Sequence, residues 1–291
     1  MVDMSMSNSR PRDILFMLQQ KFPGNKSTMK TIYNARTKHN VVKKGGKSQM
    51  QYLLGKVSEY GYFYHHRRCE KTEMVTDLFF AHPTSVELLR AFPSVLLMDC
   101  TYKTNRYRLP LLEIVGVTST GMTFQVACAF MESEREDNYM WACSILKALM
   151  DPACLPNVIV TDREIALMNA IESTFPNSRH LLCRWHIGKN IMANCKKYFR
   201  TKEKWDSFSA SWNLMVYEAS EAIFSECLRR FQADYSGYPA AVEYAMNQWI
   251  HPYKERFACA WTNEVMHFDN TTTNRYFNVN NIFIFHLIFN L

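Results

Sequence analysis

Two short apolar runs, each ending on an aspartate, place the strongest constraint on how this chain folds. Residues 95–102 read VLLMDCTY and residues 157–162 read NVIVTD, so Asp99 and Asp162 each close a segment with buried-strand character. A carboxylate at the end of a buried strand is costly unless a cation or hydrogen-bond donors meet it. If the two strands are parallel neighbours, both carboxylates lie at the same edge of one sheet.

The segments around these runs predict an α/β fold with a mixed sheet. Further strands are expected at 109–119, 122–131 and 179–187, and helices at 138–150 and 164–175. This order is typical of a hairpin meander followed by crossover units, which need parallel pairing. Residues from about 188 to 260 have helical apolar spacing and many aromatic side chains, which predicts a bundle-like helical insertion.

Residues 1–72 are strongly basic and are expected to form a separate small module. They hold 14 Lys and Arg against 4 Asp and Glu, whereas the remaining residues hold 20 against 23. Three short helices are expected, the second capped by Ser27, in a helix-turn-helix-like DNA-binding arrangement. The residues expected to contact DNA are Lys30, Arg36, Lys38, Lys43, Lys44 and Lys47. A helical linker with a solvated basic surface has the same composition, so both interpretations stay open.

Composition argues against several other classes of protein. With 47% hydrophobic and 21% charged residues, the chain is of the globular type. Nine cysteines without a C-x-x-C pair are typical of reduced thiols in a nuclear or cytosolic compartment. Neither a secretory signal nor a run of about 20 apolar residues is found, so no membrane partner is expected.

The acidic pair has two chemical interpretations. Two neighbouring carboxylates raise each other's pKa unless a cation neutralises them, and Mg²⁺ or Mn²⁺ prefers such oxygen ligands. Paired divalent ions are the machinery of phosphodiester hydrolysis and strand transfer. The alternative is that each aspartate makes a turn or a helix cap, and Asp162 could be the N-cap of the helix expected at 164–175.

Several blocks of sequence, in order, resemble the transposase domain of Mutator-like elements. They are DCTYKTNRYRLPLLEIVGV, VIVTDRE, FPNSRHLLCRWHI and, further on, WTNEVMHFDNTTTNR. They are equally similar to the plant far-red-impaired-response proteins, transcription factors related to such transposases. The resemblance covers roughly residues 90–190 and returns at 261–275. It implies a ribonuclease H-like core over residues 73–275, DNA as partner, a nuclear location, and a metal-dependent carboxylate triad whose first two acids are Asp99 and Asp162.

The third acid of that triad is missing. In the resembled family a glutamate follows the block TTTNR two residues later, whereas this chain has Phe277, which cannot ligate a hard cation. Residues 276–291 form an aberrant hydrophobic tail without any acidic residue. The acids that could substitute are Glu264, Asp269 and Glu113.

We therefore expect a DNA-binding protein with little or no strand-transfer activity and no small-molecule substrate. Whether it is an enzyme stays open. An active DDE transposase and a far-red-impaired-response-like transcription regulator are the alternatives, and homo-oligomerisation is left open.

His180, Cys183 and His186 form an H-x-x-C-x-x-H pattern with two interpretations. On a strand, Cys183 points away from the two histidines, so the three cannot bind one ion without a local turn. Zinc also needs a fourth ligand, for which Cys195 is nearest. Cys183 and His186 are similar to the family's C-x-x-H signature, so the alternatives are a structural or DNA-adjacent role and a zinc site.

Overall fold

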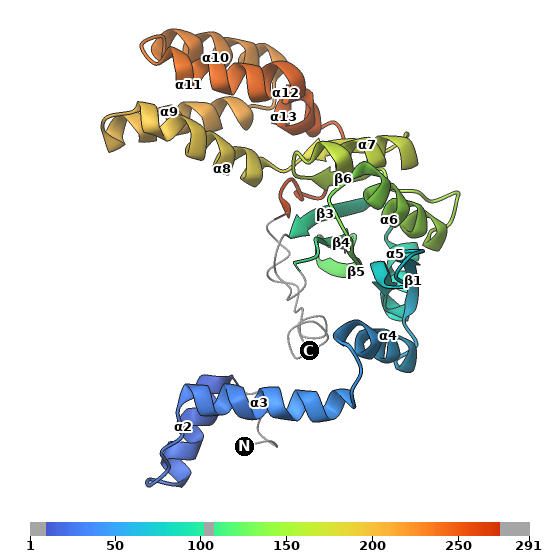
Figure 1. Cartoon of the computed structure of the whole chain (residues 1–291). Coiled ribbons are helices and arrows are strands. Elements are labelled where there is room, and N and C mark those ends of the chain that lie inside the picture. Colours follow the sequence, from blue (N-terminus) through green and yellow to red (C-terminus); the bar gives the residue numbers. More distant parts are fainter. Residues whose placement is uncertain (1–9, 102–107, 274–291) are drawn as a thin grey trace. The chain divides into compact units, whose positions relative to one another are not determined.

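The computed structural model describes residues 10–101 and 108–273, which form two compact units (Figure 1). The first unit ends at Tyr60 and the second begins at Gly61. Residues 61–72, which the sequence placed with the basic module, therefore belong to the second unit. None of the helices in the described residues is both long and apolar enough to cross a membrane.

The first unit contains three helices whose starts are set by capping side chains. They are α2 (Pro11–Lys21), α3 (Met29–Lys44) and α4 (Gln49–Glu59). Thr28, not the expected Ser27, caps α3, because its hydroxyl and that of Thr31 exchange hydrogen bonds with each other's backbone N–H. Ser48 and Gln51 make the same capping box on α4.

The core that joins α2 and α3 is small. It consists of Ile14, Leu18 and Ile32, with Leu15 packed against it. A fully buried aliphatic side chain contributes about 1.5–3 kcal/mol, so three of them leave this helix pair only modestly stable. Phe16 of α2 remains 60% exposed.

The second unit is built on a seven-stranded mixed sheet in the order β1-β2-β5-β4-β3-β6-β7. The strands are β1 (Phe63–Arg68), β2 (Val75–Ala81), β3 (Val95–Thr101), β4 (Leu111–Val117), β5 (Thr123–Phe130), β6 (Val158–Thr161) and β7 (Arg179–Leu182). The first five pair antiparallel, whereas β6 is parallel to β3 and β7 is parallel to β6. The predicted mixed α/β sheet is confirmed, although the sequence analysis did not anticipate β1 and β2.

Three helices cover one face of this sheet. They are α5 (Pro83–Ala91), α6 (Glu136–Leu149) and α7 (Ile165–Thr174), and they share a buried apolar cluster with the strands. Alternate residues of β3 serve opposite faces: Leu96 and Met98 join that cluster, while Val95 and Leu97 join a second cluster on the other face. Asp99 continues the Val95 and Leu97 side, so it points away from the helices that cover the first face.

A helical group follows β7 in the chain and packs around aromatic side chains (Figure 1). Its helices are α8 (Arg184–Cys195), α9 (Lys202–Val216), α10 (Glu221–Asp234), α11 (Pro239–Ala245), α12 (His251–Phe257) and α13 (Cys259–Thr262). Phe208, Phe231 and Phe257 are fully buried there. The helical insertion expected at about 188–260 therefore begins slightly earlier than expected and ends slightly later.

The strand predicted over 179–187 is wrong beyond Leu182. Cys183 donates its backbone N–H to the Thr161 carbonyl (2.7 Å), and its own carbonyl accepts from the Ile187 N–H (3.1 Å). Cys183 is therefore the last residue held by the sheet and also the N-cap of α8. This switch is the local turn that a joint role for Cys183 and His186 requires.

Candidate functional site

Asp99 and Asp162 lie at the carboxyl ends of two neighbouring parallel strands. In the pairing of β3 with β6, Leu97 lies opposite Val160. Continuing this register by two residues sets Asp99 beside Asp162. The two carboxyl groups interact electrostatically: the negative charge of Asp99 raises the pKa of Asp162.

The Asp162 carboxyl group is buried and lies near a second acidic group, which disfavours its charged form. Its Oδ1 is buried and has no hydrogen-bond partner among the described residues. Burial, and next the Asp99 charge, raise its pKa from 3.8 to about 6. The expected N-cap role is wrong, because Glu164 caps α7 and accepts from the Ala166 N–H (3.4 Å). Asp162 therefore lacks the local partner that would explain a buried carboxylate at this position.

The Asp99 carboxylate, unlike Asp162 Oδ1, has polar partners among the described side chains. Its Oδ2 accepts a hydrogen bond from the Thr273 hydroxyl (3.2 Å) and lies 4.0 Å from His186 Nε2. Burial raises the pKa of Asp99, while His186 and the Thr273 hydrogen bond oppose this effect without cancelling it. Asp99 is thus oriented by groups from two distant segments of the chain.

Cys183 and His186 form a coupled pair beside Asp99. Burial alone would raise the pKa of Cys183, but hydrogen bonds from His186 and Thr273 outweigh it and the pKa is lowered. For His186 burial alone would lower the pKa, but Cys183 and then the two aspartates outweigh it and the pKa is raised. The Thr273 N–H also points at the Cys183 sulfur (3.2 Å). Thr273 is the residue of this site that the sequence analysis did not single out.

The other two residues considered for zinc have different partners. His180 is 6% exposed, and its ring nitrogens lie 2.8 Å from Thr161 Oγ1 and 3.3 Å from an Arg256 nitrogen. Burial and the Arg256 charge lower the pKa of His180 to about 3. The Cys195 sulfur lies 3.7 Å from the Ala241 carbonyl, within the helical group. The structure thus brings together Cys183 and His186 alone out of the four.

Of the substitute acids, Glu113 lies in the sheet beside the acidic pair. It pairs directly with Asp99 across β3 and β4, so the two side chains share a face. Glu264 and Asp269 are exposed in the segment after α13. Phe277 and the tail 276–291 lie outside the described residues. Within the described parts of the chain, no three or more His, Cys, Asp or Glu side chains are grouped so that they could hold a metal ion.

The basic residues proposed for DNA contact lie in the first unit. Lys30, Lys38 and Lys47 are exposed, and Arg36 is half-buried. The side chains of Lys43 and Lys44 lie outside the described part of the structure. Helix α3 contains no acidic residue, so every charged side chain in its sequence is basic.

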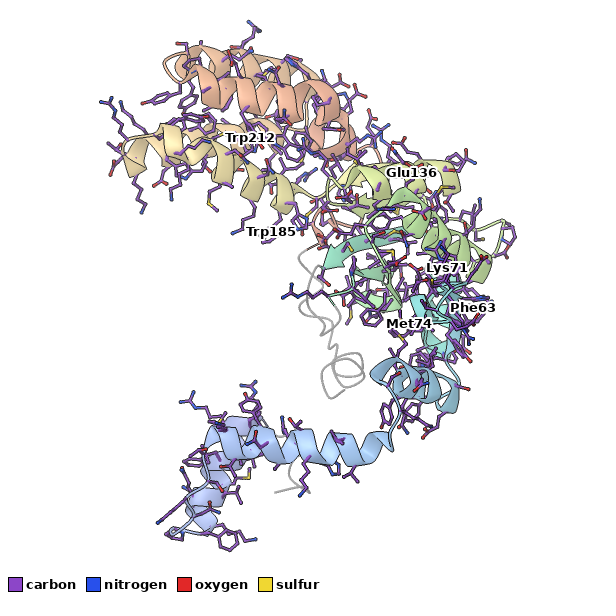
Figure 2. The ribbon with its side chains drawn as sticks, in the orientation of Figure 1. Phe63, Lys71, Met74, Glu136, Trp185 and Trp212 are labelled. Atoms are coloured by element: carbon purple, nitrogen blue, oxygen red, sulfur yellow. The ribbon has the colours of Figure 1, made fainter. Side chains whose placement is uncertain are left out.

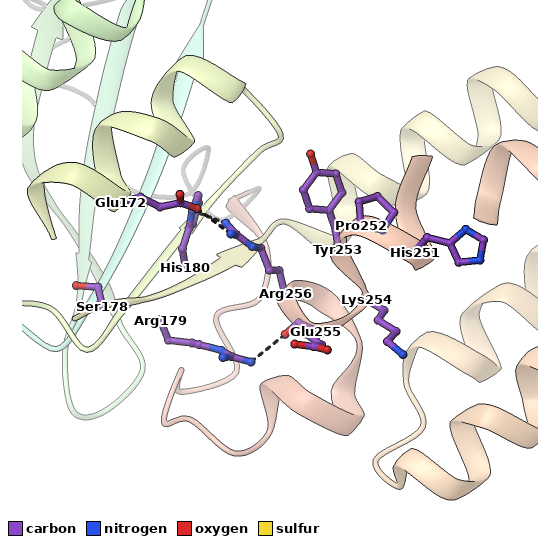
Figure 3. A pocket seen from close by; sticks show the side chains of 10 residues that line it. All are labelled: Glu172, Ser178, Arg179, His180, His251, Pro252, Tyr253, Lys254, Glu255 and Arg256. Atoms are coloured by element: carbon purple, nitrogen blue, oxygen red, sulfur yellow. Dashed lines mark hydrogen bonds and ion pairs between the residues drawn. The ribbon is translucent and has the colours of Figure 1, made fainter. Parts of the chain in front are cut away.

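A polar pocket of about 510 Å³ opens where α7 and β7 meet α12 (Figure 3). Arg256 crosses it to reach Glu172 (2.7 Å) and His180, while Arg179 donates to the Glu255 carbonyl (3.3 Å). His180 in turn contacts Thr161, whose hydroxyl donates to the Asp162 carbonyl (2.6 Å). These polar contacts join α12 to α7 and β7 and, through His180 and Thr161, reach the backbone carbonyl of Asp162.

Comparison with known proteins finds similarity to a transposase domain and to several FAR1-related proteins. Residues 95–190 match the MULE transposase domain, a stretch that contains Asp99, Asp162, Cys183 and His186. Protein FAR1-RELATED SEQUENCE 5 of Arabidopsis thaliana is 28% identical over 66% of this chain and 24% of its own length. Protein FAR-RED IMPAIRED RESPONSE 1 of the same plant is 27% identical over 50% of this chain and 17% of its own length.

A third relative comes from a fungus. PKS-NRPS hybrid synthetase cheA of Chaetomium globosum is 29% identical over 60% of this chain but only 4% of its own length. The chain thus spans about a quarter or less of each of these relatives. The similarity to MULE transposases and FAR1-related proteins that the sequence blocks predicted is confirmed.

Proposed function

Because residues 95–190 match a MULE transposase domain, we propose that this chain is a DNA-binding protein derived from a Mutator-like transposase. In this proposal the sheet is a ribonuclease H-like core that keeps two acids of a triad and has little or no strand-transfer activity. The observation that carries the proposal is the buried Asp162 oxygen without a partner beside the Asp99 carboxylate. The antiparallel meander β3-β4-β5, followed by parallel β6 and β7, supports the ribonuclease H-like assignment.

The donor chemistry of the pair fits a hard divalent cation such as Mg²⁺ or Mn²⁺. Asp99 and Asp162 would hold it, since carboxylate oxygens are its preferred ligands and Asp162 Oδ1 lacks another partner. When bound, such an ion stabilises negative charge on a phosphodiester. Thr273 and His186 contribute by orienting the Asp99 carboxylate.

A strand-nicking assay tests the expected loss of activity. In Mn²⁺, with duplex DNA that carries terminal-repeat-like ends, the unmodified chain is expected to cut no faster than the protein-free control. The physical reason is that Phe277 supplies no oxygen ligand where the resembled family has its third acid. Phe277→Glu is expected to raise nicking above background. Phe277→Gln, whose side chain has the size of Glu but no charge, is the control and should stay at background. Robust cutting by the unmodified chain that Asp99→Asn abolishes would instead favour the active transposase.

A salt titration tests the basic module. Replacing Lys30, Lys38 and Lys47 together by Gln is expected to weaken binding to duplex DNA and to flatten its salt dependence. The slope of log affinity against log salt should shrink by about 0.9 for each phosphate that the variant no longer neutralises. The matched control removes three positive charges from exposed positions of the second unit, Lys71, Arg229 and Arg230. If both triple variants bind equally weakly, the first unit is not the DNA-binding module.

The same proposal includes a nuclear location and leaves open the formation of homo-oligomers. Zinc at Cys183 and His186 stays a prediction, and metal analysis of the purified protein measures it directly. A transcription regulator of the far-red-impaired-response type is the second candidate, favoured by the similarity to the FAR1-related proteins. It predicts duplex binding without any nicking, even in Phe277→Glu.

A further inference from the structure

Helix α8 presents an exposed basic and aromatic face that begins beside the acidic pair. The stretch from Arg184 to Tyr198 contains no Asp or Glu. Four exposed side chains follow one another along one side of the helix at spacings of four, three and four residues: Trp185, Lys189, Met192 and Lys196. At 1.5 Å per residue this face is about 16 Å long, or roughly five nucleotides at the spacing of a duplex strand.

Trp185 is the exposed one of the chain's six tryptophans, all of which lie in described residues. Its side chain is 38% exposed, whereas Trp212 of the neighbouring α9 is 3% exposed (Figure 2). An exposed indole on a helix surface leaves favourable apolar area in water, and tryptophan is enriched where a partner covers it. Trp185 is not a member of any of the described apolar core clusters.

The indole ring is positioned directly next to the acidic site. It stands edge-on to the His186 ring, with centroids 4.8 Å apart and planes at 70°. His186 Nε2 lies 4.0 Å from Asp99 Oδ2. The Lys189 ammonium lies over the indole, 5.3 Å from its centroid. A planar ligand that stacks on Trp185 would therefore lie close to His186 and the acidic pair, with the Lys189 ammonium beside it.

We propose that Trp185 stacks on an unpaired base of single-stranded DNA next to the Asp99–Asp162 site, while Lys189 and Lys196 bind the flanking phosphates. This inference rests on the proposed function and adds that the DNA bound beside the acidic pair is single-stranded. An exposed aromatic ring with lysines along the same helix face suits single-stranded nucleic acid, because every base has a face to stack and the lysines can bind the phosphates. An apolar partner helix suits this face less well, because lysines alternate with its apolar residues.

The first experiment measures binding of a fluorescently labelled ten-nucleotide single strand to the full chain by anisotropy. Trp185→Ala is expected to weaken binding about tenfold, the usual effect of removing one stacked base. Trp185→Phe retains an aromatic face and is expected to stay within about threefold of the unmodified protein. Leu214→Ala, which removes a 66% exposed apolar side chain from α9, is the matched control and should change nothing. Circular dichroism melting checks that each variant is folded.

The second experiment makes the readout local. Because Trp185 is the exposed indole, saturating oligonucleotide is expected to shield part of the protein's fluorescence from acrylamide, and this shielding should vanish in Trp185→Phe. A set of oligonucleotides, each with one abasic site at a different position, locates the stacked base. When the abasic site replaces the base that stacks on Trp185, the unmodified chain and Trp185→Ala should bind that oligonucleotide with equal affinity. Unchanged affinity of Trp185→Ala for the intact strand, or no binding of the strand by any variant, would overturn the inference.

These outcomes separate the inference from the proposed function. Strand binding through Trp185 without duplex binding or any divalent-ion effect would keep the inference and reject the transposase-derived role. Duplex binding with an ion effect, but without any role for Trp185, would reject only the inference.

Discussion

Replacing Asp162 with Asn is expected to make the protein more stable at pH 7 in the absence of divalent ions. Burial and the neighbouring Asp99 raise the pKa of Asp162 to about 6, above its unfolded value of 3.8. The stability linked to this group is therefore fully present below about pH 3.8 and is lost as pH rises through about 6. Asn lacks the charge, so the free energy of unfolding at pH 7 should rise by about 3 kcal/mol.

Urea unfolding in EDTA at several pH values measures this effect. The difference between Asp162→Asn and the unmodified chain should be largest near pH 7 and should close near pH 4. Asp206→Asn, at an exposed position of α9, is the control and should stay within about 0.5 kcal/mol of the unmodified chain. A destabilised Asp162→Asn at pH 7 would mean that Asp162 has a structural partner.

In the presence of a divalent ion, the unmodified chain should instead be more stable than Asp162→Asn. If Mg²⁺ or Mn²⁺ binds the folded acidic pair, it stabilises the unmodified chain by mass action and does not stabilise Asp99→Asn/Asp162→Asn. An equal melting shift in the double variant would place any ion elsewhere.

Replacing Asp77 with Ala is expected to be the most destabilising of the changes considered, at about 3–4 kcal/mol. Asp77 on β2 is 2% exposed and accepts hydrogen bonds from Arg67 Nε (3.0 Å), Asn138 Nδ2 (2.7 Å), the Thr76 hydroxyl (2.8 Å) and the Glu132 N–H (3.2 Å). Its removal leaves the buried Asn138 amide and the partly buried Arg67 guanidinium without their acceptor, which costs more than breaking a hydrogen bond whose donor can turn to water.

The pH dependence at Asp77 has the opposite sign to that at Asp162. Burial alone would raise the pKa of Asp77, but the hydrogen bonds, first that from Arg67, outweigh it and the pKa is lowered. Its contribution is therefore present above the unfolded pKa and is lost as pH falls through the folded value. The Arg68–Glu73 pair offers a matched control nearby: it is exposed, so Glu73→Ala should cost at most about 1 kcal/mol. Equal destabilisation by Asp77→Ala and Glu73→Ala in chemical unfolding would contradict this account.

Local patterns in the sequence were sufficient for the elements that carry the acidic pair. Short apolar runs predicted β3 and β6, and helical apolar spacing predicted α6 and α7, because these elements bury their side chains on regular faces. The order of strands and helices then predicted crossover units with parallel pairing, and the observed pairing of β3 with β6 sets Asp99 beside Asp162. Strand β1, with the sequence FYHHRR, has no apolar alternation, and it is a strand because it pairs with β2.

Tertiary structure alone decided which groups surround the acids. Glu164, rather than Asp162, caps α7, and that choice leaves Asp162 without a partner among the described residues. The strand ends at Leu182 because Cys183 both completes the sheet and starts α8, which turns His186 toward Asp99. Thr273 reaches Asp99 across 174 residues of sequence. Hydrophobic periodicity is a property of neighbouring residues and can be read along the chain, whereas the contacts of His186 and Thr273 with Asp99 join distant segments and exist only after the sheet and helices have packed.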